Sequence, residues 1–211
     1  MMDETTLTAE QFDDPEQEHS ASVQGMWVFL STETLFFGVL FASYVVSRFN
    51  YPEAFAAASN QTDIVIGTIN TGILLTSSLT MAGAVRGAKL GRDKLTIGFL
   101  ILTFTLGAVF LILKGIEYHE DYEHHLVPGL NLIHKGPQEI FFYLYFVMTG
   151  FHTLHLTLGL LIIIAITVMT WRKRFSSRYF TPVELTGLYW SFVDIVWIFL
   201  YPSLYLVSRG T

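Results

Sequence analysis

The chain has 211 residues, of which 52% are hydrophobic and only 14% are charged, against about 25% charged in an ordinary soluble domain. A composition so poor in charge predicts an integral membrane protein. The formal net charge of −6 argues against nucleic-acid binding. The absence of cysteine excludes disulfides, thiolate catalysis, iron–sulfur clusters and Cys-type zinc sites.

The N-terminal segment is polar and acidic. Residues 1–20 contain seven acids and no Lys or Arg, so the segment lacks the basic region of a signal peptide. We interpret it as a solvated tail outside the membrane, with docking to a basic partner as the alternative. The predicted division is an acidic tail at 1–22 and a membrane domain at 23–211.

Five apolar segments are each long enough to cross a bilayer, which takes roughly 20 residues. No run of ten alternating residues suggests a membrane barrel, and backbone groups in lipid must be hydrogen-bonded internally, so all five are predicted to be helices. The fold class is therefore all-α, an integral membrane bundle of five transmembrane helices. The predicted spans are about 25–47, 64–85, 95–116, 139–170 and 184–207.

The distribution of Lys and Arg between the loops predicts the orientation. Eight of the twelve basic residues lie in the loops after the second and fourth spans, and these two loops share one side of the membrane. The N-terminus is therefore predicted inside and the C-terminus outside, in a bacterial-type inner membrane or its organelle equivalent. The loop at 117–138, rich in His and acidic residues, would lie outside.

Ionisable residues inside a bilayer are costly, which makes them candidates for function. Four are predicted there: Glu33, His152, His155 and Asp194. The two histidines share a helix face because they are three residues apart, and we expect Glu33 to meet one of them across a helix contact. Interhelical hydrogen bonds that stabilise the bundle are the preferred interpretation of this buried polar cluster. A lipid-related or electrostatic role, a proton path, and a metal or haem site are the alternatives.

A second candidate metal site lies in the predicted outer loop, where His119, His124 and His125 stand among acidic residues. Imidazole and carboxylate groups suit several divalent ions. The spacing matches no specific zinc pattern, so a solvated loop is the preferred interpretation.

Several motifs, taken in chain order, resemble one known family. They are Gly-Met-Trp-Val-Phe-Leu-Ser-Thr-Glu at 25–33, Asn-Thr at 70–71, Glu-Tyr at 117–118, Thr-Gly-Phe-His-Thr-Leu-His at 149–155 and Tyr-Trp-Ser-Phe-Val-Asp-Ile-Val-Trp at 189–197. Over about residues 22–208 the chain resembles subunit III of the haem–copper respiratory oxidases, in the five-helix form. The family usually has His where Ser191 stands.

The resemblance implies a subunit with no catalytic residues and no cofactor of its own. Haem and copper would belong to subunits I and II, its partners in a complex that reduces oxygen and moves protons, most simply a cytochrome c oxidase. Subunit III would bind phospholipid in a V-shaped cleft between its first two spans and the other three, and would support stability and proton uptake. Arg172, Lys173 and Arg174 would suit lipid phosphates.

Four other identities stay open on the sequence. A quinol oxidase subunit III would differ mainly in its partner and electron donor, and a nitric oxide reductase accessory protein has similar five-helix motifs. A free-standing transporter is a different class. A di-haem membrane cytochrome is opposed by geometry, because His152 and His155 on one helix cannot supply opposite axial ligands to one haem.

Overall fold

The structure, a computed structural model, describes residues 15–129, 136–173 and 180–207. All regular structure in these ranges is helical, and five of the helices are long and apolar enough to cross a membrane. The predicted all-α fold with five spans is confirmed. The helices are α1 (Pro15–Asn50), α2 (Pro52–Ser59), α3 (Ile64–Lys89), α4 (Asp93–Glu123), α5 (Pro137–Trp171) and α6 (Thr181–Tyr205).

Two helices are longer than the hydropathy pattern predicts. Helix α1 begins at Pro15 and so continues across the predicted boundary between tail and membrane domain at residue 22. Helix α4 ends at Glu123 rather than near 116, so the first part of the predicted outer loop is helical. The short helix α2 was not predicted, and it begins with Pro52 at its first position, where the missing N–H costs no hydrogen bond.

The turns between helices follow from local hydrogen bonding. The Asp63 carboxylate caps α3 by accepting from the backbone N–H groups of Val65 and Ile66. Helix α3 ends where Gly91 adopts a φ of 64° and the N–H of Arg92 donates to the carbonyl of Gly87. This is a Schellman motif, which glycine accommodates without strain. The chain therefore reverses within a few residues, and α4 packs directly on α3.

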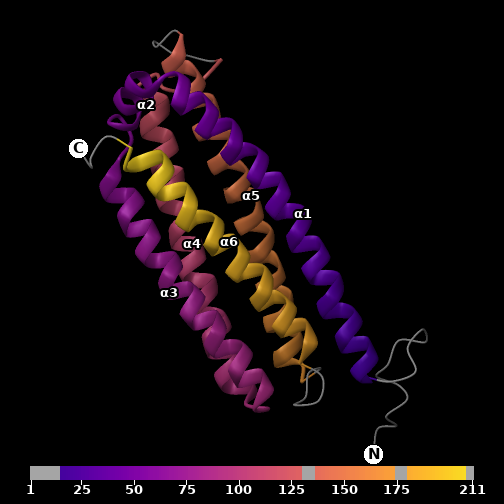
Figure 1. The fold of residues 1–211 in the computed structure, drawn as a ribbon. Helices are drawn as coiled ribbons and strands as arrows, with labels where there is room; N and C mark the ends of the chain where they lie inside the picture. The colour runs from indigo at the N-terminus through magenta and orange to yellow at the C-terminus, as the bar shows by residue number, and fades with distance from the viewer. Residues whose placement is uncertain (1–14, 130–135, 174–179, 208–211) are drawn as a thin grey trace, which may run out of the picture.

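Helix α6 lies at the centre of the bundle and packs against α3, α5 and α1 (Figure 1). Its two tryptophans, Trp190 and Trp197, are almost completely buried. Trp190 fits between α4 and α5 because Gly107 and Gly159 leave room for the indole ring. The indole N–H of Trp190 donates to the Ser77 hydroxyl on α3. Close approach at glycine and hydrogen bonds to hydroxyls are typical of helix packing in lipid.

Helix α1 lies at the edge of the bundle, where it packs on α6 and α5, whereas α3 packs chiefly on α4 and α6 (Figure 1). The expected grouping of the first two spans against the other three is therefore wrong for this chain. The physical reason is the tight turn at Gly91, which makes α3 and α4 a closely packed hairpin. The start of α1 and the end of α6 lie at opposite ends of the bundle, as five crossings require.

Candidate functional site

The predicted contact between Glu33 and a histidine is present at the α1–α5 interface. Glu33 Oε2 lies 3.0 Å from His155 Nε2, and the Nδ1–H of His155 donates to the Phe151 carbonyl at 2.8 Å. With Nδ1 committed to the carbonyl, a single proton is shared between the Nε2 atom and the carboxyl group. The ring of Phe37 packs against the imidazole at a centroid distance of 5.3 Å.

His152 faces another part of the bundle. Its side chain is completely buried, its Nε2 lies 3.1 Å from the Val193 carbonyl of α6, and its ring packs against Phe110 and Trp197. Its Nδ1 atom has no hydrogen-bond partner among the described residues. The two histidines are three residues apart, and their side chains point to neighbouring faces of α5, so that His152 contacts α6 and His155 contacts α1.

Asp194 lies at a third place, on the face of α6 that meets α3. The side chain is buried, and it lies beside the hydroxyl groups of Ser77 and Ser78. Neither carboxyl oxygen makes a hydrogen bond of ordinary geometry within the described residues. The predicted cluster of Glu33, His152, His155 and Asp194 is thus three separate polar sites, because α6 stands between the α1 and α3 contacts.

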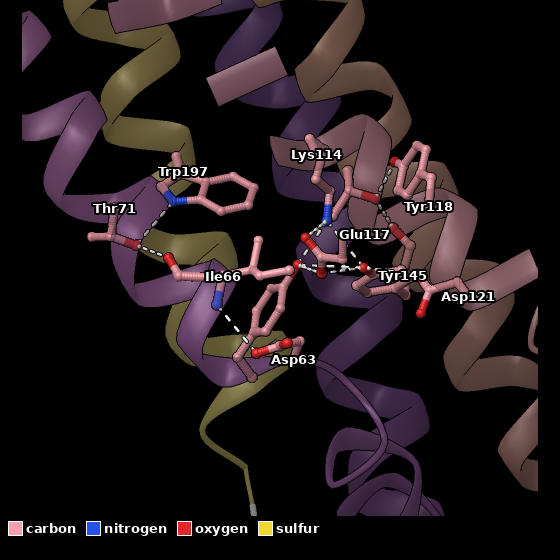
Figure 2. A network of polar contacts seen from close by, with 12 residues as sticks. Asp63, Ile66, Thr71, Lys114, Glu117, Tyr118, Asp121, Tyr145 and Trp197 are labelled. Atoms are coloured by element: carbon pink, nitrogen blue, oxygen red, sulfur yellow. Dashed lines mark hydrogen bonds and ion pairs between the residues drawn. The ribbon is translucent and has the colours of Figure 1, made fainter. Parts of the chain in front are cut away.

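A buried charged site that the sequence reasoning missed surrounds Lys114 on α4. Figure 2 shows Lys114 and Glu117 turned toward Tyr145 of α5. The Lys114 side chain is 1% exposed. Its ammonium group donates to Glu117 Oε2 at 3.1 Å, to the Tyr145 hydroxyl at 3.0 Å and to the Tyr205 hydroxyl at 2.7 Å. All three of its protons are therefore used.

Two tyrosines and a second acid complete this site. The hydroxyl groups of Tyr145 and Tyr205 donate to Glu117 Oε1, and Tyr145 also lies 3.3 Å from Asp121 Oδ2. The aromatic rings of Tyr118, Tyr145, Trp197 and Tyr205 are 4.8–5.7 Å from the Lys114 ammonium, a range in which the ring quadrupole attracts a cation. We call Lys114, Glu117, Asp121, Tyr145 and Tyr205 the Lys114 cluster.

The sequence contained a signal for this cluster. Lys114, Glu117 and Asp121 are spaced by three and four residues, which places them on one helix face. The hydropathy pattern ends the third predicted span near residue 116. It therefore assigns Lys114 to the outer end of the span and places Glu117 and Asp121 in the outer loop, although all three are buried in the structure. In the structure the cluster joins α4, α5 and α6 near the end of the bundle where α2 lies.

The outer histidines are not arranged as a metal site in the part of the chain that the structure describes, where no group of three or more His, Asp or Glu side chains could hold an ion. His119 Nε2 lies 3.4 Å from Glu123 Oε1 along α4, and both side chains are exposed. Of the expected lipid-binding residues, Arg172 and Lys173 are exposed just beyond the end of α5. Arg174 lies outside the described residues.

An apolar groove runs between α1 and α6, with a volume of about 580 Å³. Trp27, Phe37 and Phe41 of α1 and Phe192 and Phe199 of α6 line much of it, and Ser191 contributes one of its few hydroxyl groups. At the N-terminal end of α1, His19 Nδ1 lies 2.9 Å from the Thr181 hydroxyl. This contact fixes α1 to α6 below the groove.

Comparison with known proteins identifies the family. The family model described as "Cytochrome c oxidase subunit III" matches residues 18–209. The chain is 31% identical to cytochrome c oxidase subunit 3 of Thermostichus vulcanus, over 98% of this chain and 97% of that protein. It is 30% identical to quinol oxidase subunit 3 of Bacillus spizizenii, over 90% and 88%.

A third relative, the heme-copper oxidase subunit I+III of Aeropyrum pernix, is 32% identical over 86% of this chain and 22% of that longer protein. The relatives thus include cytochrome c oxidases, quinol oxidases and a subunit I+III polypeptide. Together with the five membrane spans, the match over nearly the whole length shows that this multi-pass membrane protein belongs to the cytochrome c oxidase subunit III family.

Proposed function

We propose that the chain is subunit III of a cytochrome c oxidase, and that it supports the complex without carrying out the redox chemistry. Its partners would be subunits I and II, which would hold the haem and copper. The near full-length match to the Thermostichus vulcanus protein favours the cytochrome c type. A quinol oxidase is the alternative, supported by the match to the Bacillus spizizenii subunit at 30% identity over 90% of this chain.

Attachment to subunit I is supported by the name of one relative. In Aeropyrum pernix a segment similar to this chain is part of a polypeptide named subunit I+III. A segment fused to subunit I remains beside it, which is the arrangement we propose for the separate chain. The large apolar surface of α1, whose most hydrophobic segment is only 17% buried, is available for lipid and for a neighbouring subunit.

Lipid binding is proposed at the groove between α1 and α6. Its volume of about 580 Å³ and its aromatic lining suit an acyl chain rather than a polar ligand. Glu33 and His155 link α1 to α5 near this groove, so this partly buried pair would hold one wall in place. Arg172 and Lys173 are exposed beyond α5, where with Arg174 they would meet lipid phosphates. Loss of bound lipid would lower the stability of the complex and the supply of protons to subunit I.

The orientation is proposed with the N-terminus inside. The turn at 90–92, the end of α5 and the start of α6 lie at the same end of the bundle as the start of α1 (Figure 1). In the sequence, the segments that follow α3 and α5, with the adjoining helix ends, carry eight of the twelve basic residues, and a basic side is retained in the cytoplasm.

The test is purification of the full chain from its membrane through an affinity tag in mild detergent. We expect a haem–copper subunit I and a subunit II to copurify, with a haem spectrum and oxygen uptake driven by reduced cytochrome c. Uptake driven only by quinol would assign the alternative type. A nitric oxide reductase as sole partner, or transport by the reconstituted chain alone, would overturn the proposal.

A further inference from the structure

The Lys114 cluster has fewer protons than its hydrogen-bond geometry requires. Lys114 donates its three protons to Glu117, Tyr145 and Tyr205. Each tyrosine oxygen accepts one of these bonds and keeps a single hydroxyl proton to donate. The Tyr205 proton goes to Glu117 Oε1.

Tyr145 then faces two acceptors with one proton. Its hydroxyl lies 2.7 Å from Glu117 Oε1 and 3.3 Å from Asp121 Oδ2. The shorter contact takes the proton, because one hydroxyl makes one strong donor bond. The Tyr145 oxygen is then left without a proton toward two neighbours, the Tyr205 hydroxyl at 3.3 Å and Asp121 Oδ2 at 3.3 Å, and of these the contact with the carboxylate is the repulsive one. This contact is favourable when Asp121 itself carries a proton and donates it to the second lone pair of Tyr145.

We propose that Asp121 is a proton-binding site, in which a carboxylic acid donates to Tyr145 and exchanges its proton with the aqueous phase at this end of the bundle. With that proton bound, every donor in the cluster has an acceptor, and the charges of Lys114 and Glu117 balance. When the proton leaves, the buried cluster carries one carboxylate more than its lysine can neutralise, which low-dielectric surroundings disfavour.

The position of Asp121 near the end of α4 gives its carboxyl proton a route to the surface of the bundle. Lys114 and Glu117 are each 1% exposed, whereas Asp121 is 6% exposed and lies within the last turn of α4. The helix ends in a Schellman motif, in which the N–H of Leu126 donates to the Asp121 carbonyl and His125 adopts a φ of 57°. The carboxyl group therefore lies between the closed cluster and the surface.

The charged groups around Asp121 come from two helices. Lys114, Glu117 and Glu120 act on it from its own helix, and Tyr145 faces it from α5. The contribution of α6 reaches it through Tyr205, which lies 3.3 Å from the Tyr145 hydroxyl. The buried position of Asp121 and the negative charges of Glu117 and Glu120 favour an Asp121 that holds its proton, whereas the positive charge of Lys114 opposes it.

Infrared difference spectroscopy on the detergent-purified complex that contains this chain tests the site. Spectra are compared across pH values above the range in which exposed carboxyl groups titrate. We expect a carboxylic acid C=O band that shifts in D2O, disappears as the pH rises, and is absent from Asp121→Asn. The matched control is Glu120→Gln, one position away on the exposed side of α4, which should keep the band.

A second variant keeps the test decisive if Asp121→Asn fails to assemble. Tyr145→Phe removes the oxygen that accepts from Asp121, so the C=O band should move to higher frequency while still titrating. Identical titrating bands in the wild type and Asp121→Asn, or a band unmoved in Tyr145→Phe, would show that Asp121 is not the proton-binding group. The result does not depend on whether cytochrome c or quinol feeds the complex.

Discussion

Glu33 of α1 and His155 of α5 meet at 3.0 Å, 122 residues apart in the chain. The contact joins the helix at the edge of the bundle to one of the helices it packs on. Because Nδ1 of His155 is bound to the Phe151 carbonyl, the Nε2 atom depends on Glu33 for its partner. The pair therefore orders both the imidazole and the position of α1.

Removal of Glu33 should loosen α1. Glu33→Ala leaves the largely buried His155 Nε2 without a partner, which costs about 1–3 kcal/mol in the free energy of unfolding. Glu33→Gln keeps a hydrogen-bonding group at the same place and should cost less. The measurement is the melting temperature of the purified complex, with Thr32→Ala as control because that hydroxyl bonds only to its own helix at Phe29. Equal melting temperatures for Glu33→Ala and wild type would show that the contact contributes nothing.

Lys114 should be among the least replaceable residues of the chain. Lys114→Met leaves the Glu117 carboxylate buried without its cation, and breaking a buried ion pair in this way costs about 3–5 kcal/mol. The double variant Lys114→Met with Glu117→Gln removes the unpaired charge and should recover part of the loss. Yield of assembled complex and its melting temperature are the readouts. Lys94→Met, exposed in the first turn of the same helix, should behave as the wild type.

Gly107 should tolerate no side chain, because a Cβ there would lie 2.8 Å from Trp190 and 2.9 Å from Leu160. Gly107→Ala forces the buried indole to shift and should destabilise the bundle by about 1–3 kcal/mol. On the same helix, Gly98 and Gly115 have open space at the Cβ position. Alanine at either should be neutral or slightly stabilising, since alanine favours helix over glycine by about 1 kcal/mol. A melting temperature for Gly107→Ala that matches these two controls would contradict the packing.

The proposed lipid groove can be filled from Gly38, which lines it and has open space at its Cβ position. Gly38→Phe should displace an acyl chain, so that fewer lipids are retained when the complex is analysed by native mass spectrometry. The complex should also lose activity sooner during turnover. Gly25→Phe adds the same ring to α1 at a position outside the groove and should retain the wild-type number of lipids. The lipid assignment fails if the two variants retain lipid equally.

The membrane spans could be predicted because apolar length is a property of the sequence alone. Span 4, expected at 139–170, is helix α5 at Pro137–Trp171. The end of α4 could not be found in this way, since Lys114, Glu117 and Asp121 lower the local hydropathy while their spacing buries them on one helix face. Whether a charge near a span end faces water or the bundle depends on partners such as Tyr145 and Tyr205, which lie on other helices.

The candidate polar site was predicted only in part for a related reason. Helical spacing places His152 and His155 on neighbouring faces, about 60° apart around the axis. The sequence does not say which helix lies against each. In the structure His155 contacts α1 and His152 contacts α6. The expected cluster around the two histidines is therefore a set of separate contacts. Asp194 contacts α3 rather than the histidines, because α6 packs on α3 as well as on α1 and α5, and Asp194 lies on the face of α6 toward α3.

The place of α1 at the edge of the bundle has a consequence for biogenesis. Helix α1 leaves the ribosome well before the membrane helices it packs on, α5 and α6, are made. During that interval Glu33 stays in the bilayer without His155, so its carboxyl group must be tolerated there unaided. Docking of α1 therefore follows the synthesis of α5 and α6, and until then α1 lies in the bilayer without these two partners.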